Sequence, residues 1–253
     1  MIRKLDMKKI QVFILFIISI TIAPNLVGQS TFGGMFNLNF GYGMEWPGGD
    51  MANRFGRNLK ISIGAEQILS SKFYYGLDFD YKFNAPVKED VFAPYRAENG
   101  VLYGSFGVPS ETIIRGRGMF IGIYAGKIFS KNIEIPKGLK AGLGVGLLQH
   151  ELIFNDDTQS FEIINGVYSK GYDRLSRGLA IKSHIGYMFV SKDKKLNMNF
   201  LVDYTLAFSH NVRKFNFDQA AFDTEGKIDH LIGLKFEILL PFYRYSEEEI
   251  IYY

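Results

Sequence analysis

Apolar and polar residues alternate along much of this sequence, and this alternation constrains the fold more than any other feature. In Lys195–His210, KLNMNFLVDYTLAFSH, one parity carries leucine, methionine, valine and aromatic residues, whereas the other carries mainly asparagine, aspartate, threonine and serine. A period of two residues indicates a β-strand with one apolar and one polar face. A soluble sheet would bury the apolar face in protein, whereas a membrane barrel turns it to lipid and encloses the polar face.

The same alternation recurs in seven further segments, which predicts eight strands in all. These segments are Gly34–Met44, Asn58–Leu69, Lys72–Phe83, Arg117–Phe129, Gly138–His150, Gly178–Phe189 and Lys227–Tyr243. Each is about long enough to cross a bilayer at a tilt. The alternation is least regular in Arg117–Phe129, and a hairpin around VLYGSFGV would add two strands to the predicted number.

The predicted connections alternate between short and long. SS, SKNIEIPK and SKDKK join the second strand to the third, the fourth to the fifth and the sixth to the seventh. The other connections, 45–57, 84–116, 155–177 and 211–226, are longer and polar. Short turns in the periplasm and long loops outside are typical of outer-membrane barrels. We therefore predict an all-β, transmembrane, antiparallel up-and-down barrel, with a secreted lipocalin-like protein or a sandwich as the alternative.

The polar faces of the predicted strands carry many charged residues. Unpaired burial of each charge would be costly, but inside a narrow barrel the charges can pair with one another. We therefore predict a filled, polar, non-conducting lumen. The predicted lumen network consists of Lys60, Glu66, Asp78, Asp80, Lys82, Lys182, His184, Asp203, Lys235 and Glu237. Tyrosines of the apolar faces are expected at the membrane interfaces, namely Tyr42, Tyr81, Tyr187 and Tyr243.

The first residues have the anatomy of a secretory signal peptide. Lys8 and Lys9 precede a short apolar core, IQVFILFIISITI, and APNLVGQ offers a cleavage point after Gly28. We expect residues 1–28 to be removed, residues 29–244 to form the barrel and residues 245–253 to form a periplasmic tail. The sequence contains no cysteine, which excludes disulfides and lipid attachment through an N-terminal cysteine.

Removal of the signal peptide leaves a chain without net charge. Residues 1–28 contain four of the 29 basic residues and one of the 26 acidic residues, so that 25 of each remain. Such a chain offers no strongly basic face, and we therefore do not expect nucleic acid as a partner.

The sequence predicts no catalytic, cofactor or metal site. Adjacent strand residues point to opposite faces, so Ser183 and His184 cannot act together as nucleophile and base. Asp156–Asp157 lacks the spacing of a calcium loop and is expected in a solvated turn. The glycines of GLGVG alternate within a strand, which predicts a flat lumen patch against which a bulky group packs.

Two of the long loops carry aromatic residues. NGVYSKGYDRLSRG (165–178) contains the adjacent Asp173 and Arg174, whereas RKFNFDQAAFDTEGK (213–227) interleaves three phenylalanines with two aspartates. Aromatic residues on outer loops lower solubility unless they cover the barrel mouth or a partner. The sequence leaves both roles open.

The stretch YSKGYDRLSRG, followed by FNFDQAAFDTEGKIDHLIGLKFEILLPFYR, resembles a family of small Bacteroidota outer-membrane barrels with a GYDRL loop motif. That family is similar to accessory barrels of the type IX secretion translocon, of the PorD kind. The resemblance covers roughly the C-terminal third. It implies a larger translocon barrel and periplasmic lipoproteins as partners, and no catalytic residue. The candidate partner-binding residues are Tyr172, Asp173, Arg174 and Leu175 in the motif and Phe215, Phe217, Asp218 and Asp223 in the following loop.

Taken with the resemblance, the sequence predicts a non-enzymatic, lipid-embedded outer-membrane subunit of a secretion system or a similar surface assembly. The first alternative is a stand-alone surface barrel, an adhesin or defence protein, that binds ligands by its outer loops. A lipid A-modifying enzyme and a narrow pore are further alternatives.

Overall fold

The computed structural model describes most of the chain after the predicted signal peptide. The described residues are 33–104, 107–110, 112–131, 136–156, 161, 164, 168–191 and 197–243. They belong to one compact unit, Thr31–Tyr253. The predicted signal peptide, 1–28, and the predicted tail, 245–253, lie outside the described residues.

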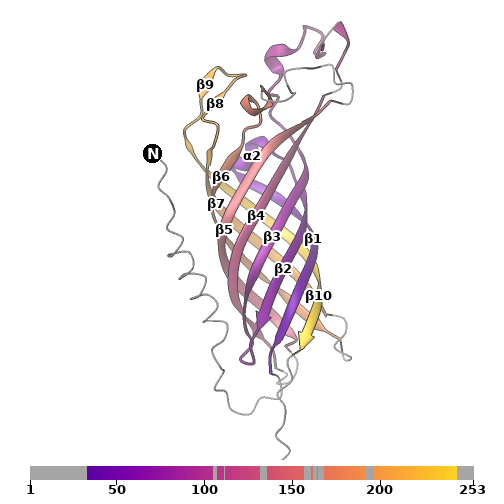
Figure 1. Ribbon diagram of the computed structural model, residues 1–253, viewed down its shortest axis with the longest axis vertical. Coiled ribbons are helices and arrows are strands. Elements are labelled where there is room, and N and C mark those ends of the chain that lie inside the picture. The colour runs from indigo at the N-terminus through magenta and orange to yellow at the C-terminus, as the bar shows by residue number, and fades with distance from the viewer. Residues whose placement is uncertain are drawn as a thin grey trace, which may run out of the picture. The chain divides into compact units, whose positions relative to one another are not determined.

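Eight long strands form a closed antiparallel barrel (Figure 1). The strands are β1 (Met35–Gly49), β2 (Asn58–Ile68), β3 (Phe73–Pro86), β4 (Ile113–Phe129), β5 (Gly138–Asn155), β6 (Ser176–Val190), β7 (Asn197–Asn211) and β10 (Gly226–Tyr243). Each barrel strand pairs with the barrel strands that come before and after it in the chain, and the last strand, β10, pairs with β1 to close the ring. The predicted up-and-down barrel of eight strands is confirmed.

The two ends of the barrel differ in the length of their connections (Figure 1). One end, here called the loop end, carries α2 (Asp50–Arg54), the 3-10 helices η1 (Ala93–Tyr95) and η4 (Tyr168–Gly171), and a small hairpin of β8 (Phe215–Asn216) and β9 (Ala221–Phe222). The opposite end, the turn end, carries the three shorter connections. Among the described residues no helix is long and apolar enough to cross a membrane.

The extra pair of strands lies in a different connection from the one that the sequence suggested. Between β3 and β4 the described residues form only isolated bridges, Arg96 with Leu102 and Tyr103 with Pro109. The β8–β9 hairpin forms instead between β7 and β10, where Phe215 pairs with Phe222. Four residues between the two strands of this hairpin are enough for a tight turn.

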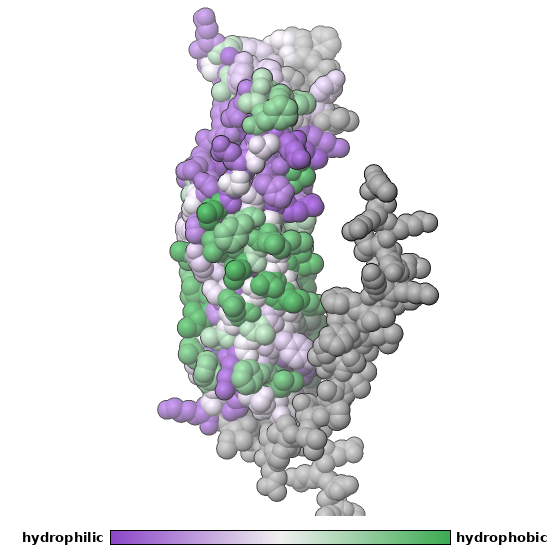
Figure 2. All heavy atoms as spheres, turned by 90° about the vertical axis from the view of Figure 1, so that its left-hand side faces the viewer, coloured by the Kyte–Doolittle hydropathy of each residue, from purple (hydrophilic) through white to green (hydrophobic). Residues whose placement is uncertain are grey.

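Apolar side chains cover the outside of the barrel, and polar ones line its inside. The outward side chains of β4 include Ile121 and Ile123, which are 57% and 59% exposed, whereas Lys60 and Asp80 on the inward face are 0% exposed. On the side of the barrel shown in Figure 2, a hydrophobic belt lies below a hydrophilic region near the loop end. This arrangement is that of a transmembrane barrel, since lipid meets the apolar face and the polar face is enclosed.

Apolar clusters close the lumen at both ends of its charged middle layer. The turn-end cluster consists of Met35, Ile68, Tyr74, Ile128, Met188, Val190 and Leu239. The loop-end cluster joins strand residues such as Leu148 and Leu231 to loop residues such as Phe92 and Tyr172. The glycine patch predicted on β5 lies in the lumen, where a Cβ on Gly142 would sit 2.5 Å from the Tyr74 hydroxyl. The lumen is therefore filled, as predicted.

A cation in the middle of the apolar belt should destabilise the barrel. We expect Ile123→Arg to lower the free energy of unfolding by about 2–4 kcal/mol, because its charge faces the bilayer midplane. Met119→Arg, on the same face of β4 but next to Arg117, should cost only about 0–1 kcal/mol. Denaturant unfolding of the two variants in lipid vesicles tests this. Equal losses for both would contradict the assignment of the belt.

Candidate functional site

The structure brings all ten predicted lumen residues together inside the barrel. Nine of them are buried, and His184 is half-buried with its Nε2 2.7 Å from the Tyr74 hydroxyl. The described barrel strands bury five lysines and seven carboxylates, so that most of the buried charges have a partner of opposite sign. Opposite charges in such numbers can satisfy one another without solvent.

Lysines at the centre of the lumen bridge carboxylates from different strands. The ammonium group of Lys60 lies 3.0 Å from Glu45 and 2.6 Å from Asp203, and Lys82 also donates to Glu45. Lys182 donates to both Asp78 and Asp80 at 2.5 Å. These contacts join β1, β2, β3, β6 and β7 across the lumen.

Two further ion pairs extend the network toward the turn end. Lys140 lies 2.6 Å from Glu66, whose other contact is a hydrogen bond from the Tyr124 hydroxyl at 3.1 Å. Lys235 lies 2.8 Å from Glu237, which also accepts a hydrogen bond from Asn199. Charge therefore fills the lumen from the strand centres to the turn-end cluster.

Glu45 is a lumen residue that the sequence analysis placed in a loop. The first strand was predicted to end at Met44, which placed Glu45 in a loop, but β1 continues to Gly49. Glu45 is 0% exposed and contacts both Lys60 and Lys82. The parity of Gly41, Gly43 and Glu45 continues the inward face, and this was the signal available in the sequence.

The two serine–histidine neighbours of the described strands are not arranged as nucleophile and base. The Ser183 hydroxyl points away from the lumen and donates to the carbonyl of Tyr204 at 3.5 Å, whereas His184 faces Tyr74. Near the loop end, Ser209 donates to Asp229 at 2.5 Å, and His150 approaches the same carboxylate oxygen at 3.1 Å. His150 is therefore not placed to take the proton of Ser209. The described residues contain no group of three or more potential metal ligands.

Arg174 ties several connections of the loop end together. It is 2% exposed, and its guanidinium lies 2.8 Å from Glu89 and 2.6 Å from Asp218. Glu89 also accepts a hydrogen bond from Arg54 of α2 at 2.9 Å. One buried arginine and one glutamate therefore connect α2 with the β3–β4, β5–β6 and β7–β10 connections.

The electrostatics of this cluster keep Glu89 ionised. Burial alone would raise the pKa of Glu89, but the charges of Arg54 and Arg174 outweigh burial and hold the pKa below its ordinary value of 4.5. Burial would likewise lower the pKa of Arg174, but hydrogen bonding to Asp218 and the charge of Glu89 raise it. The ion pairs are therefore complete at neutral pH.

The remaining residues of the GYDRL motif are also buried. The Tyr172 ring packs on Phe92, and its hydroxyl lies 2.6 Å from that of Tyr95. Asp173 pairs with Arg213 at 2.8 Å, and its backbone carbonyl accepts the amide of Leu152 at 2.7 Å. Leu175 is 7% exposed. All four motif residues thus hold the loops together, and their burial is at odds with direct contact to a partner.

The hairpin that follows β7 presents its aromatic residues unequally. Phe222 is 78% exposed and Phe217 is 46% exposed, whereas Phe215 is half-buried between their rings. The Phe217 amide donates to the carbonyl of Gly171, and a Cβ on Gly171 would collide with the Phe217 ring. This glycine therefore allows the hairpin to pack against η4.

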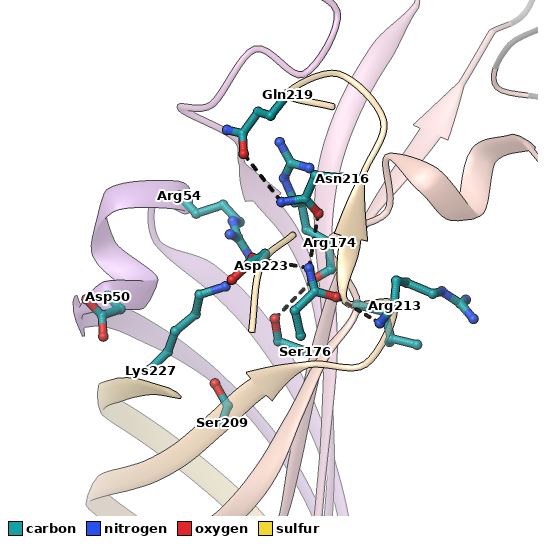
Figure 3. Close-up of polar contacts among 12 residues, drawn as sticks. Asp50, Arg54, Arg174, Ser176, Ser209, Arg213, Asn216, Gln219, Asp223 and Lys227 are labelled. Atoms are coloured by element: carbon teal, nitrogen blue, oxygen red, sulfur yellow. Dashed lines mark hydrogen bonds and ion pairs between the residues drawn. The ribbon is translucent and has the colours of Figure 1, made fainter. Parts of the chain in front are cut away.

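Acidic residues anchor the same hairpin. Asp218 pairs with Arg174, and Asp223 lies 2.6 Å from Lys227 and accepts a hydrogen bond from Asn211 at 3.1 Å (Figure 3). Burial would raise the pKa of Asp223, but hydrogen bonds from Lys227 and Asn211 lower it below 3.8. Of the second set of candidate residues, only Phe217 is well exposed.

A polar cavity of about 320 Å³ opens beside this cluster. Its lining residues come from α2, the β3–β4 connection and the strand ends, and include Arg54, Glu89, His150, Lys227 and Asp229. Figure 3 shows Asp50, Arg54 and Lys227 around it. The cavity has the size of the smaller known ligand sites, and its lining suits a polar ligand.

The chain is similar to known proteins in its overall fold alone. No family model matches the chain. No curated protein matches it. Among solved structures, Neisserial surface protein A aligns at 11% identity and a TM-score of 0.43, covering 82% of this chain and 97% of its own. The attachment invasion locus protein Ail of Yersinia pestis aligns at 10% and 0.44, covering 83% and 99%. OprG from Pseudomonas aeruginosa aligns at 12% and 0.40, covering 85% and 99%. These likenesses are too distant to assign any residue a role.

Removal of the Glu45 charge should destabilise the barrel strongly. We expect Glu45→Gln to lower the free energy of unfolding by about 3–5 kcal/mol, because Lys60 and Lys82 lose a shared buried counter-charge. Denaturant unfolding in detergent measures the loss. Glu225→Gln, the same change at an exposed position of the loop end, is the control and should cost little. A Glu45→Gln variant as stable as that control would show that the network does not carry the barrel's stability.

The loop end should loosen in acid. The pKa values of Glu89 and Asp223 are lowered in the folded protein, so their stabilising contribution is complete above their ordinary values of 4.5 and 3.8. It is lost as the pH falls through the lower folded values. Hydrogen exchange, corrected for the intrinsic effect of pH, should show that peptides covering 87–95 and 213–225 lose protection below pH about 4. A Glu89→Gln variant should already exchange faster at pH 7, and unchanged protection of the wild type in acid would refute the role of these pairs.

Proposed function

We propose that this protein is a non-enzymatic outer-membrane barrel that works as a closed scaffold for binding at its loop end, with the long loops outside. The observation that carries this proposal is the buried cluster around Arg174, which fixes four connections into one platform. A surface that is ordered before binding loses less conformational entropy when a partner docks.

The interior argues for a scaffold rather than a pore. Ion pairs occupy the centre of the lumen, and apolar clusters occupy both ends. An open conducting path would require several of these buried pairs to separate, which is costly in a low-dielectric interior. In planar bilayers we therefore expect no ion conductance above the background of the membrane.

The exposed aromatic side chains of the hairpin favour a macromolecular partner. Phe217 and Phe222 stand on the same short hairpin, which Arg174 and Asp223 anchor to the barrel. Exposed aromatic residues on a rigid support are typical anchor residues of protein interfaces. The buried GYDRL residues would support this surface, and the exposed phenylalanines would touch the partner.

The proposed function takes two forms, which differ in the partner that binds at the loop end. In the first, which rests on the resemblance of the GYDRL motif, the barrel is an accessory subunit of a type IX-like secretion translocon, with a larger translocon barrel and periplasmic lipoproteins as partners. In the second, it is a stand-alone surface barrel, an adhesin or defence protein. A lipid A-modifying enzyme is less well supported, because Ser183 and His184 lie on opposite faces of β6.

Affinity purification from outer membranes in mild detergent, with a tag after Tyr253, separates the two forms. Recovery of a large secretion barrel with periplasmic lipoproteins would support the translocon form. Recovery of the protein alone, while loop variants lose surface binding and secretion stays intact, would support the stand-alone form. An altered lipid A profile in a deletion strain would contradict a non-enzymatic role.

Loss of the hairpin phenylalanines should abolish partner capture without unfolding the barrel. We expect Phe217→Ser/Phe222→Ser to reduce recovery of the partner at least tenfold, because interface anchors contribute about 2 kcal/mol or more each. Tyr103→Ser, an exposed aromatic residue on the β3–β4 connection, is the matched control and should retain the partner. Heat-dependent gel migration checks that each variant is folded. Undiminished capture by the double variant would rule out the hairpin as the binding surface.

A further inference from the structure

The outward face of β4, β5 and β6 changes from apolar to basic within two rows of paired residues. In one row of paired residues, Ile121, Leu147 and Leu179 face lipid and are 57%, 47% and 70% exposed. In the next row toward the loop end, Gln149 lies between Met119 and Arg177, and in the row after it Arg117 pairs with Glu151. This step marks the edge of the apolar belt on that side of the barrel.

Two guanidinium groups at this edge are held by the side chains of the strand between them. Arg117 donates to Glu151 through Nε at 3.1 Å and Nη2 at 2.6 Å. Arg177 donates to Gln149 through Nε at 2.9 Å and Nη2 at 2.6 Å. Gln149 and Glu151 are two residues apart on one face of β5, so their anchor points are about 7 Å apart along the strand.

The charge of this patch is only partly neutralised. Glu151 faces Arg117, but the acceptor of Arg177 is a neutral amide, and no carboxylate of the described chain lies within ion-pair distance of Arg177 or Arg115. Arg115, Arg117 and Arg177 are all exposed on the outward face, and His210 is the cross-strand partner of Arg177. The three arginines and Glu151 together carry a net charge of +2.

We infer that Arg117 and Arg177, with Arg115, form a binding site for the phosphate groups of membrane lipid at the loop-end edge of the apolar belt. Acyl chains cover the apolar row below, so the head groups of the same lipids lie at the height of the arginines. A guanidinium offers a planar fork of donors that matches two phosphate oxygens. Arg177 is held through Nε and Nη2 by the neutral amide oxygen of Gln149, and Arg117 is held in the same way by Glu151 and also hydrogen-bonds to Tyr81.

This site is separate from the binding surface proposed at the hairpin. It lies on the side wall of the barrel, and it depends only on the apolar belt and the register of β4 to β6. The inference holds whichever side of the membrane the loop end faces.

Native mass spectrometry of the full chain in detergent tests the inference. The probe is short-chain phosphatidic acid, which carries a phosphate monoester, and phosphatidylcholine with the same acyl chains is its comparison. Each basic residue near an anionic surface contributes a factor of about five, so Arg117→Gln/Arg177→Gln should bind phosphatidic acid about 30-fold more weakly than the wild type. Arg177→Gln alone should lose about fivefold, which keeps the test valid if the double variant does not fold.

Two further variants separate phosphate binding from a general effect of charge. Lys127→Gln removes an outward cation of the same strand near the turn end, where Lys127 lies over the Phe73 ring at 4.8 Å, and should bind like the wild type at the loop-end site. Glu151→Gln removes the carboxylate that competes for Arg117 and should strengthen binding.

Three results would overturn the inference. These are wild-type affinity in the double variant, equal binding of phosphatidylcholine, and weaker binding by Glu151→Gln. Displacement of the lipid by inorganic phosphate at an equal concentration would assign the site to free phosphate and overturn the assignment to lipid.

Discussion

The structure depends on the pairing of β10 with β1. A sheet surrounded by lipid cannot leave the N–H and C=O groups of an edge strand unpaired, and closure into a ring removes both edges. The pairing runs from Met35 with Tyr243 to Gly49 with Asp229. Once the ring is closed, the inward side chains of eight strands share one narrow space. Their sizes, charges and hydrogen-bonding groups then have to match one another, because an unpaired polar group in this enclosed space is costly.

The charged middle layer of the lumen follows from that enclosure. Lys60, between Glu45 and Asp203, is stable only because strands distant in sequence bring both acids to it. Removal of one partner would leave a charge that a filled interior cannot solvate. The same enclosure makes the barrel a rigid support, and the loop end can then carry a surface whose geometry does not depend on the partner. The function proposed for the hairpin therefore rests on the lumen as much as on the loops.

The sequence was a good guide to the barrel and a poor guide to the loop end. Alternation is a local signal, and it predicted eight strands, their inward faces and the filled lumen because lipid imposes the same period everywhere. It missed Glu45 because Pro47-Gly48-Gly49 is typical of a turn, although Trp46 continues the apolar parity and the strand runs on to Gly49. The burial of Arg174 could not be predicted, since its partners Glu89 and Asp218 lie 85 and 44 residues away in the chain. A charged loop motif alone is typical of a solvated surface.

The two arginines of the sequence Asp-Arg-Leu-Ser-Arg show how position decides the chemistry of a residue. Arg174 lies just before β6 and is buried, and the carboxylates of Glu89 and Asp218 neutralise its charge within the protein. Arg177 lies three residues later on the outward face of β6, where its guanidinium donates to the amide oxygen of Gln149. An arginine paired with carboxylates of its own chain stabilises the fold. An arginine held by a neutral amide keeps a net positive charge, which can attract an anion outside the chain. Because Arg177 stands where the apolar belt ends, the nearest source of negative charge outside the chain is the head-group layer of the membrane itself.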